Sequence, residues 1–187
     1  MRKIKSFKLI LRPHEVKRRA KKAGLDLETA GLGDPALAKL LERLAKALAP
    51  GVLFDTFGSA DPDQSILSPM PGLAYSLILA GLGEAFTPVR AAQTGVPEGL
   101  WPLLEEAALD ESVRFASGII ADEAEQDNCE LSPLTPLAEV AALEAVVRKL
   151  DGVKLGISFQ DGKLFPAASL AVSLSWLAKS KAKGRSK

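Results

Sequence analysis

The chain has few of the side chains that reactive sites usually need. It contains one histidine, His14, and one cysteine, Cys129, among 187 residues. Zinc and iron–sulfur sites need several such ligands at set spacings, so a single chain cannot build one alone. A serine hydrolase would have to recruit His14, and no Gly-x-Ser-x-Gly turn accompanies any serine. The sequence therefore predicts no metal ligand and no catalytic residue.

Long apolar runs are also missing. The longest, Leu73 to Leu82, is interrupted by Ser76 and Gly81, and it is much shorter than the roughly 20 residues that span a bilayer. The single cysteine cannot form an internal disulfide, and no secretory signal pattern opens the sequence. These features predict a cytoplasmic protein without membrane contact.

The net charge of +1 hides an uneven distribution. Ten of the 24 basic residues lie between Arg2 and Lys22, against the single acid Glu15, and five more lie in the tail 179–187. The remaining body holds nine basic and 22 acidic residues. The basic ends either contact nucleic acid or an acidic protein partner, or are simply solvated. They carry no series of aromatic residues for base stacking, which makes nucleic acid the less favoured partner.

The length favours a single domain over residues 1–178, followed by a disordered basic tail at 179–187. Hydrophobic periodicity in the first half predicts strands at 7–11, 52–57 and 73–79 and helices at 14–23 and 34–49. Asp34 is expected to cap the second helix, because Pro35 follows it at a typical first-turn position. The loop at 59–72 carries three prolines and is expected to be the most mobile segment.

The second half predicts further helices and a hairpin. We expect a helical region from Pro102 to about Glu125, in two pieces near Asp110, and a helix opened by Thr135-Pro136 that runs to Leu150. Strands are expected at 153–157, at 164–165 after the turn dipeptide Asp161-Gly162, and at 170–176, where small residues leave a helix open as the alternative. Helices and strands thus mix within one α+β domain.

Two kinds of motif have a functional and a structural interpretation. Gly31-Leu32-Gly33 and Gly81-Leu82-Gly83 lack the rest of a nucleotide-binding fingerprint, so we interpret them as turn glycines. Acids cluster at 105–111 and 122–127, where they either form a solvated helix face or hold a hard cation; the solvated face is the favoured interpretation. Cys129 has no neighbouring cation in the sequence that would activate it as a nucleophile.

Three segments stand out in the last third of the chain: Cys129–Pro136 (CELSPLTP), Gly152–Leu155 (GVKL) and Phe165–Ser173 (FPAASLAVS). In order and approximate spacing they resemble the ligand loop, strand and Pro-x-x-Ser segment of the activation domain of cobalamin-dependent methionine synthase. The resemblance implies an α+β fold, a twisted antiparallel sheet with packed helices. It also implies a domain that docks on a corrinoid-binding protein or methyltransferase and presents S-adenosylmethionine for the reactivation of cobalamin.

The resemblance also implies where a ligand would bind. The matching positions are the cofactor-binding candidates Glu130, Leu131, Ser132, Pro133, Leu134 and Thr135. Glu130 stands where the family places an arginine for the ligand carboxylate, and Leu134-Thr135 replace Gly-Tyr. These departures argue against S-adenosylmethionine binding in the family's usual way, whereas cobalamin would remain on the partner. The alternative is a non-enzymatic interaction module that uses its basic ends.

Overall fold

The computed structural model describes residues 1–179. The strands are β1 (Arg2–Lys5), β2 (Gly51–Gly58), β3 (Ala74–Gly81), β4 (Cys129–Leu131), β5 (Thr135–Pro136), β6 (Ser158–Gln160), β7 (Lys163–Phe165) and β8 (Ser169–Ala178). The helices are α1 (Pro13–Lys22), α2 (Asp34–Ala47), α3 (Gln64–Leu67), α4 (Phe86–Ala92), α5 (Leu100–Gln126), α6 (Val140–Lys149) and the 3-10 helix η1 (Gly152–Leu155). The chain is an α+β protein, as expected.

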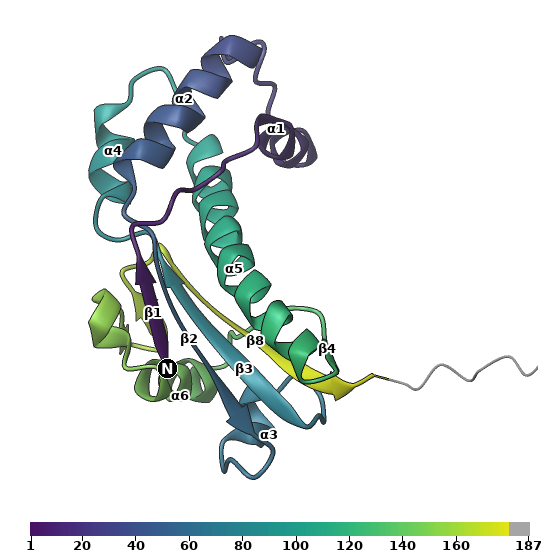
Figure 1. Ribbon diagram of the computed structural model, residues 1–187. Coiled ribbons are helices and arrows are strands. Elements are labelled where there is room, and N and C mark those ends of the chain that lie inside the picture. The colour runs from purple at the N-terminus through teal and green to yellow at the C-terminus, as the bar shows by residue number, and fades with distance from the viewer. Residues whose placement is uncertain (180–187) are drawn as a thin grey trace, which may run out of the picture.

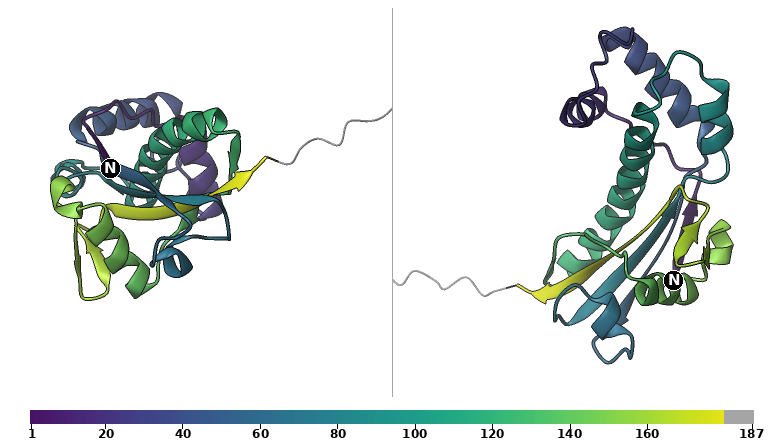
Figure 2. Two further views of the ribbon diagram at one scale, coloured as in Figure 1. Left: turned by 60° about the horizontal axis from the view of Figure 1, so that its bottom comes forward. Right: turned by 180° about the vertical axis from the view of Figure 1, so that it is seen from behind.

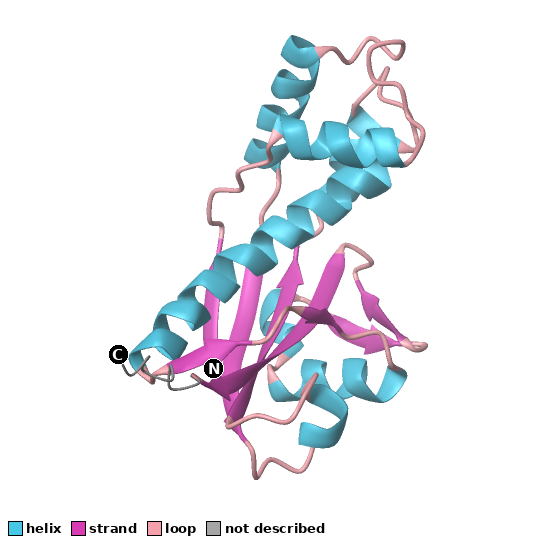
Figure 3. Ribbon diagram, turned by 90° about the vertical axis from the view of Figure 1, so that its right-hand side faces the viewer, coloured by secondary structure: helices cyan, strands magenta, loops and turns pink. Residues whose placement is uncertain are grey.

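The central sheet is antiparallel throughout. Its strand order is β1-β2-β3-β8, and β4 and β5 share the outer edge of β8. Long strands with apolar residues facing both sides, such as β3, occupy the middle, while the short and charged β1 lies at the opposite edge. The hairpin β6-β7 forms a separate small sheet. The sheet is visibly twisted in Figures 1 and 3.

Each face of the sheet is covered by a different layer. The long helix α5 lies across one face, and α3, α6, η1 and the β6-β7 hairpin cover the other (Figures 2 and 3). Alternate residues of one strand divide between the two layers, because side chains in a strand point to opposite faces. Phe54 belongs to the core under α5, and its neighbour Leu53 to the core under α6.

Helices α1, α2 and α4 pack with the beginning of α5 beyond one end of the sheet (Figure 1). One continuous core joins this helical part to the α5 face of the sheet. In α2 the predicted stripe is buried at Leu37, Leu40, Leu41 and Leu44. The 27-residue α5 is about 40 Å long at 1.5 Å per residue, which lets it reach from the helical part to the far end of the sheet.

Several predicted elements are confirmed with small changes at their ends. The helices predicted at 14–23 and 34–49 are α1 and α2, and the strands at 52–57, 73–79 and 170–176 are β2, β3 and β8. The predicted hairpin turn lies between β6 and β7, where Asp161 and Gly162 both have positive φ. The loop 59–72 contains the short α3, and α4 lies in a stretch for which no helix was expected.

Two predicted strands are wrong, although their alternation is real. Residues 7–11 form no strand, because the sheet edge is occupied by β1 and the chain turns at Ser6, whose φ is 55°. Leu9 is nevertheless buried, and Phe7 stacks on Phe115 of α5 with 4.3 Å between ring centroids. Residues 152–155 form η1, whose neighbours Asp151 and Gly156 have left-handed backbones.

Three predicted helix features are also wrong. Thr135 and Pro136 pair with Ser173 and Val172 in the sheet, so α6 begins only at Val140. The helix expected in two pieces near Asp110 is the single α5, since no glycine or proline interrupts it there and Asp110 bonds to Arg19. Asp34 makes no side-chain cap of α2; its carboxylate pairs with Lys17. The tail predicted to be disordered lies outside the described residues except for Lys179.

Candidate functional site

The six candidate residues 130–135 form a loop at the outer edge of β8. Glu130 and Leu131 pair with Leu177 and Trp176 through β4, the chain bulges at 132–134, and Thr135 returns to pair with Ser173. All six residues therefore lie within one short edge segment. We call residues 129–136 the edge loop.

Ser132 fixes the edge loop to β8. Its backbone N–H donates to the carbonyl of Ser175 at 2.9 Å, and its hydroxyl accepts the N–H of Ser175 at 2.8 Å. The same hydroxyl donates to the carbonyl oxygen of Pro133 at 3.1 Å. These bonds occupy the Ser132 hydroxyl, which accepts the N–H of Ser175 where β4 and β5 leave a gap in the edge strand. The hydroxyl is therefore not free to bind a ligand.

The tip of the edge loop points away from the sheet. Pro133 and Thr135 are exposed, and the side chain of Leu134 is 41% exposed. Glu130 is exposed as well. The hollows described below are lined by other residues. The edge loop is thus a small, fixed surface with one apolar and one acidic side chain, which suits contact with a protein better than enclosure of a small ligand.

A second cluster lies on the loop between β2 and β3 and was missed from the sequence. Lys149, in the last turn of α6, donates to both oxygens of Asp61 at 2.7 and 2.8 Å and lies 3.2 Å from Asp63. Tyr75 donates its hydroxyl to Asp61 at 3.0 Å, and Arg148 donates to Asp63 at 3.0 Å. We call these five residues the Asp61 cluster. The signal in the sequence was the pair of aspartates around Pro62, close to the chain's only tyrosine.

Protonation in the Asp61 cluster is fixed by its hydrogen bonds. Burial alone would raise the pKa of Asp61, but the bonds from Lys149, the Asp63 N–H and Tyr75 outweigh it and lower that pKa. Burial would lower the pKa of Lys149, but its bonds to Asp61 and Asp63 raise it. Burial and the bond to Asp61 raise the pKa of Tyr75. A general acid or base needs a pKa near the working pH. The cluster therefore holds the loop between β2 and β3 against α6 and is not suited to proton transfer.

The first acidic cluster of the sequence meets the basic helix α1. The guanidinium of Arg19 lies 3.0 Å from Glu106 and 2.6 Å from Asp110, and it also bonds to Glu15. In the second cluster, Glu123 pairs with Arg2. Part of the basic N-terminal stretch therefore neutralises acids of the body. These contacts favour the structural interpretation of both clusters over a cation site.

A hollow of about 390 Å³ lies beside the first acidic cluster, between α5 and the beginning of β8. Glu105 and Asp110 are its half-buried carboxylates, and Pro102, Leu109 and Leu170 are among its apolar walls. Burial raises the pKa of Glu105, and Arg90 partly opposes this shift. Within the described residues Glu105 forms no ion pair, and the buried hydroxyl of Ser169, a residue that also lines the hollow, has no hydrogen-bond partner.

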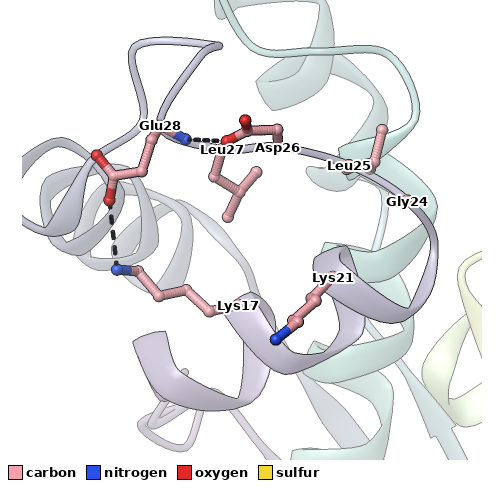
Figure 4. A pocket seen from close by; sticks show the side chains of 7 residues that line it. All are labelled: Lys17, Lys21, Gly24, Leu25, Asp26, Leu27 and Glu28. Carbon is pink, nitrogen blue, oxygen red and sulfur yellow. Dashed lines mark hydrogen bonds and ion pairs between the residues drawn. The ribbon is translucent and has the colours of Figure 1, made fainter.

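A second hollow, of about 400 Å³, lies between α1 and the loop that follows it (Figure 4). Its polar groups are already bonded to one another. Lys17 lies 3.7 Å from Glu28, and Asp26 accepts the N–H of Glu28 at 3.0 Å. Of its charged residues, Lys21 and Asp26 form no ion pair within residues 1–179, and Asp26 also bonds to Thr29. This hollow therefore presents little chemistry to a ligand.

The remaining sequence motifs find structural roles. Gly31 and Gly83 have φ values of 73° and 72°, so both glycines allow a left-handed backbone conformation in a turn. Over residues 1–179, no three of the histidine, cysteine, aspartate and glutamate side chains gather as metal ligands would. His14 is exposed on α1 and Cys129 is buried in β4. No helix of the described part combines the length and apolarity needed to cross a membrane.

Comparison of the sequence with protein-family models found no match, and comparison with curated proteins found none either.

Proposed function

We propose that this chain is a stand-alone, activation-like docking domain that binds a corrinoid-binding protein or methyltransferase and supports the reactivation of its cobalamin. The observation that carries the proposal is the edge loop. The edge loop is the segment that most closely resembles the activation domain. It is an exposed surface, and the pairing of both β4 and β5 with β8 holds it in place. A surface fixed in this way loses little conformational freedom on binding, and this favours recognition.

Two further observations support a docking role. The chain has the α+β fold with a twisted antiparallel sheet that the resemblance implies. The edge loop presents an apolar side chain, Leu134, and the charged side chain of Glu130, and both are exposed. Apolar contacts at the centre of a small interface with charges around them are typical of protein–protein recognition.

The edge loop gives less support to S-adenosylmethionine binding. The hydroxyl of Ser132 is hydrogen-bonded to the N–H of Ser175 in β8, and the carboxylate of Glu130 would repel the carboxylate of S-adenosylmethionine. The proposed role is therefore to hold the partner in position, while cobalamin on the partner supplies the methyl-transfer chemistry. We place this role in the cytoplasm, in keeping with the single unpaired cysteine.

The test is direct binding to a corrinoid-binding methyltransferase loaded with hydroxocobalamin, measured by biolayer interferometry. We expect saturable binding by the full chain and a loss of about tenfold or more in affinity for Leu134→Glu, because a charge would be buried at the contact. Ile10→Glu is the matched control, since Ile10 is a similarly exposed aliphatic residue in another part of the chain. Absence of binding, or equal losses in both variants, would contradict the proposal.

Calorimetry with S-adenosylmethionine distinguishes docking alone from docking combined with binding of this ligand. With ligand at millimolar concentration we expect no heat of binding. Saturable heat that disappears in a Ser132→Ala variant would show that the edge loop keeps the ligand site of the family. In that case the docking role would be only part of the function.

A further inference from the structure

The strand β1 is the outer edge of the central sheet (Figure 1), where it pairs only with β2 among residues 1–179. The register places Lys3 opposite Leu53 and Lys5 opposite Gly51. Directly opposite residues share a face, and Leu53 belongs to the core under α6. Lys3 and Lys5 therefore lie on the α6 side, whereas Arg2 reaches the α5 side and pairs with Glu123.

The helix η1 brings a third lysine to the same place. Gly51 leaves room for η1, since a methyl group added at Gly51 would lie 2.7 Å from Leu155 and 3.6 Å from the Cγ of Lys5. Lys154, the neighbour of Leu155, comes close enough to influence Lys3. Burial, then Lys5 and Lys154, lower the pKa of Lys3, and Asp151 opposes them only weakly. We call Lys3, Lys5 and Lys154 the β1 lysine surface.

The positive charge of the β1 lysine surface is poorly compensated. Lys154 lies 3.1 Å from Asp151, but Lys3 and Lys5 form no ion pair within residues 1–179. All three lysines are exposed. This contrasts with Arg2, Lys17 and Arg19 of the same basic stretch, each of which pairs with a carboxylate. Lys3 and Lys5 are thus the two basic residues of this stretch that lie on a strand edge and form no ion pair within residues 1–179, whereas the unpaired Lys8, Arg12, Lys21 and Lys22 lie outside the sheet.

We propose that the β1 edge binds an acidic, extended segment of a partner protein, which adds to the sheet as a further strand. An edge strand offers unpaired backbone N–H and C=O groups, and a peptide in strand conformation can bond to them. Side chains two residues apart on the added strand face the same side. Carboxylates at alternate positions would then meet Lys3 and Lys5. A second copy of this β1 is disfavoured, because its lysines would face like charges.

An acidic peptide fits this edge better than nucleic acid does. The body of the chain, without its two basic ends, carries 22 acidic against nine basic residues and would repel a long polyanion. The lysine surface is short, and its feature beyond charge is the strand edge, which a peptide can use and a phosphate backbone cannot. The inference does not depend on the proposed cobalamin role.

The test uses the full chain and a fluorescein-labelled short peptide in which glutamate alternates with threonine. We expect anisotropy to report saturable binding, and amide NMR signals of residues 2–5 to shift. The double variant Lys3→Glu/Lys5→Glu should lose about tenfold or more in affinity. A peptide with lysine in place of glutamate should bind this variant and not the wild type, because the charges are then exchanged.

The matched control is Lys39→Glu/Lys163→Glu, which changes the net charge equally at two exposed lysines elsewhere. It should bind the acidic peptide about as well as the wild type does. Circular dichroism and urea unfolding establish that both variants fold. Equal losses in the two variants, unchanged binding with N-methylated peptide backbone, tighter binding of a single-stranded oligonucleotide at the same residues, or no binding by the wild type would each overturn the proposal.

Discussion

The ammonium nitrogen of Lys149 lies 2.7 and 2.8 Å from the two carboxylate oxygens of Asp61, although 88 residues separate them in the sequence. The pair joins the end of α6 to the loop between β2 and β3. Lys149 also lies over the ring of Phe57, with 4.8 Å to its centroid. Both charged side chains are largely buried, at 13% and 17% exposure. One cation thereby holds a loop, a helix and the end of β2 together.

Replacement of Lys149 by methionine should destabilise the protein. The carboxylates of Asp61 and Asp63 would stay partly buried without their shared cation, so we expect the free energy of unfolding to fall by about 1–3 kcal/mol. Urea unfolding measures the change. Lys46→Met is the control, because its pair with Glu42 is exposed, and its effect should stay within about 0.5 kcal/mol. Equal effects of the two substitutions would contradict a special role for the Asp61 cluster.

The same cluster predicts a pH dependence of stability. The folded pKa of Asp61 lies below its usual value, since the bonds from Lys149, Asp63 and Tyr75 outweigh the effect of burial. Its contribution is therefore fully present above the unfolded pKa of about 4 and is lost as the pH falls through the folded pKa. Asp61→Asn should destabilise the protein at neutral pH, and the difference from wild type should shrink in acid. Urea midpoints measured from neutral pH to about pH 3 test this; a difference that grows in acid would refute it.

Features that depend on neighbouring residues were predictable from the sequence. Asp161-Gly162 predicts the hairpin turn because both positions need positive φ, and the structure has φ values of 48° and 79° there. The leucines of α2 predict its buried stripe for the same local reason. The resemblance to the activation domain predicted the fold class. The candidate residues that the resemblance identified all lie in the edge loop, at the edge of β8.

Features that depend on distant residues were not predictable. The alternation around Leu9 predicts a strand, yet Leu9 is buried by tertiary packing while β1 takes the sheet edge. Thr135-Pro136 has the local signal of a helix start, but bonding to β8 outweighs it. Contacts across the fold likewise create the Asp61 cluster and decide which cations of the basic stretch are neutralised.

Gly162→Ala should weaken the β6-β7 hairpin. Gly162 has a φ of 79°, which a residue with a Cβ adopts only with strain, so we expect a loss of about 1 kcal/mol. The strain is in the backbone, since an added methyl group would meet only Val140 at an ordinary 3.6 Å. Gly58→Ala is the control, because Gly58 has no atom within 4 Å of the added group and no positive φ. Urea unfolding of both variants should separate them, and a Gly58 variant as unstable as the Gly162 variant would exclude backbone strain as the cause.

Ser76→Ala should disturb the α5 side of the sheet. The Ser76 hydroxyl is completely buried, accepts the indole N–H of Trp176 at 2.7 Å and lies 2.7 Å from the hydroxyl of Thr56. Its removal leaves the buried indole donor without a partner, which should cost about 1–3 kcal/mol in the free energy of unfolding. The near-ultraviolet circular dichroism of Trp176 should change as well.

The control for this substitution is Ser117→Ala on α5, where the hydroxyl bonds only to a backbone carbonyl of its own helix. Alanine is also the better helix former, so this variant should be neutral or slightly more stable. If Ser76→Ala unfolds at the same urea concentration as wild type, the indole has found another acceptor. The hydrogen bond across β3 and β8 would then contribute little to holding these two central strands in register.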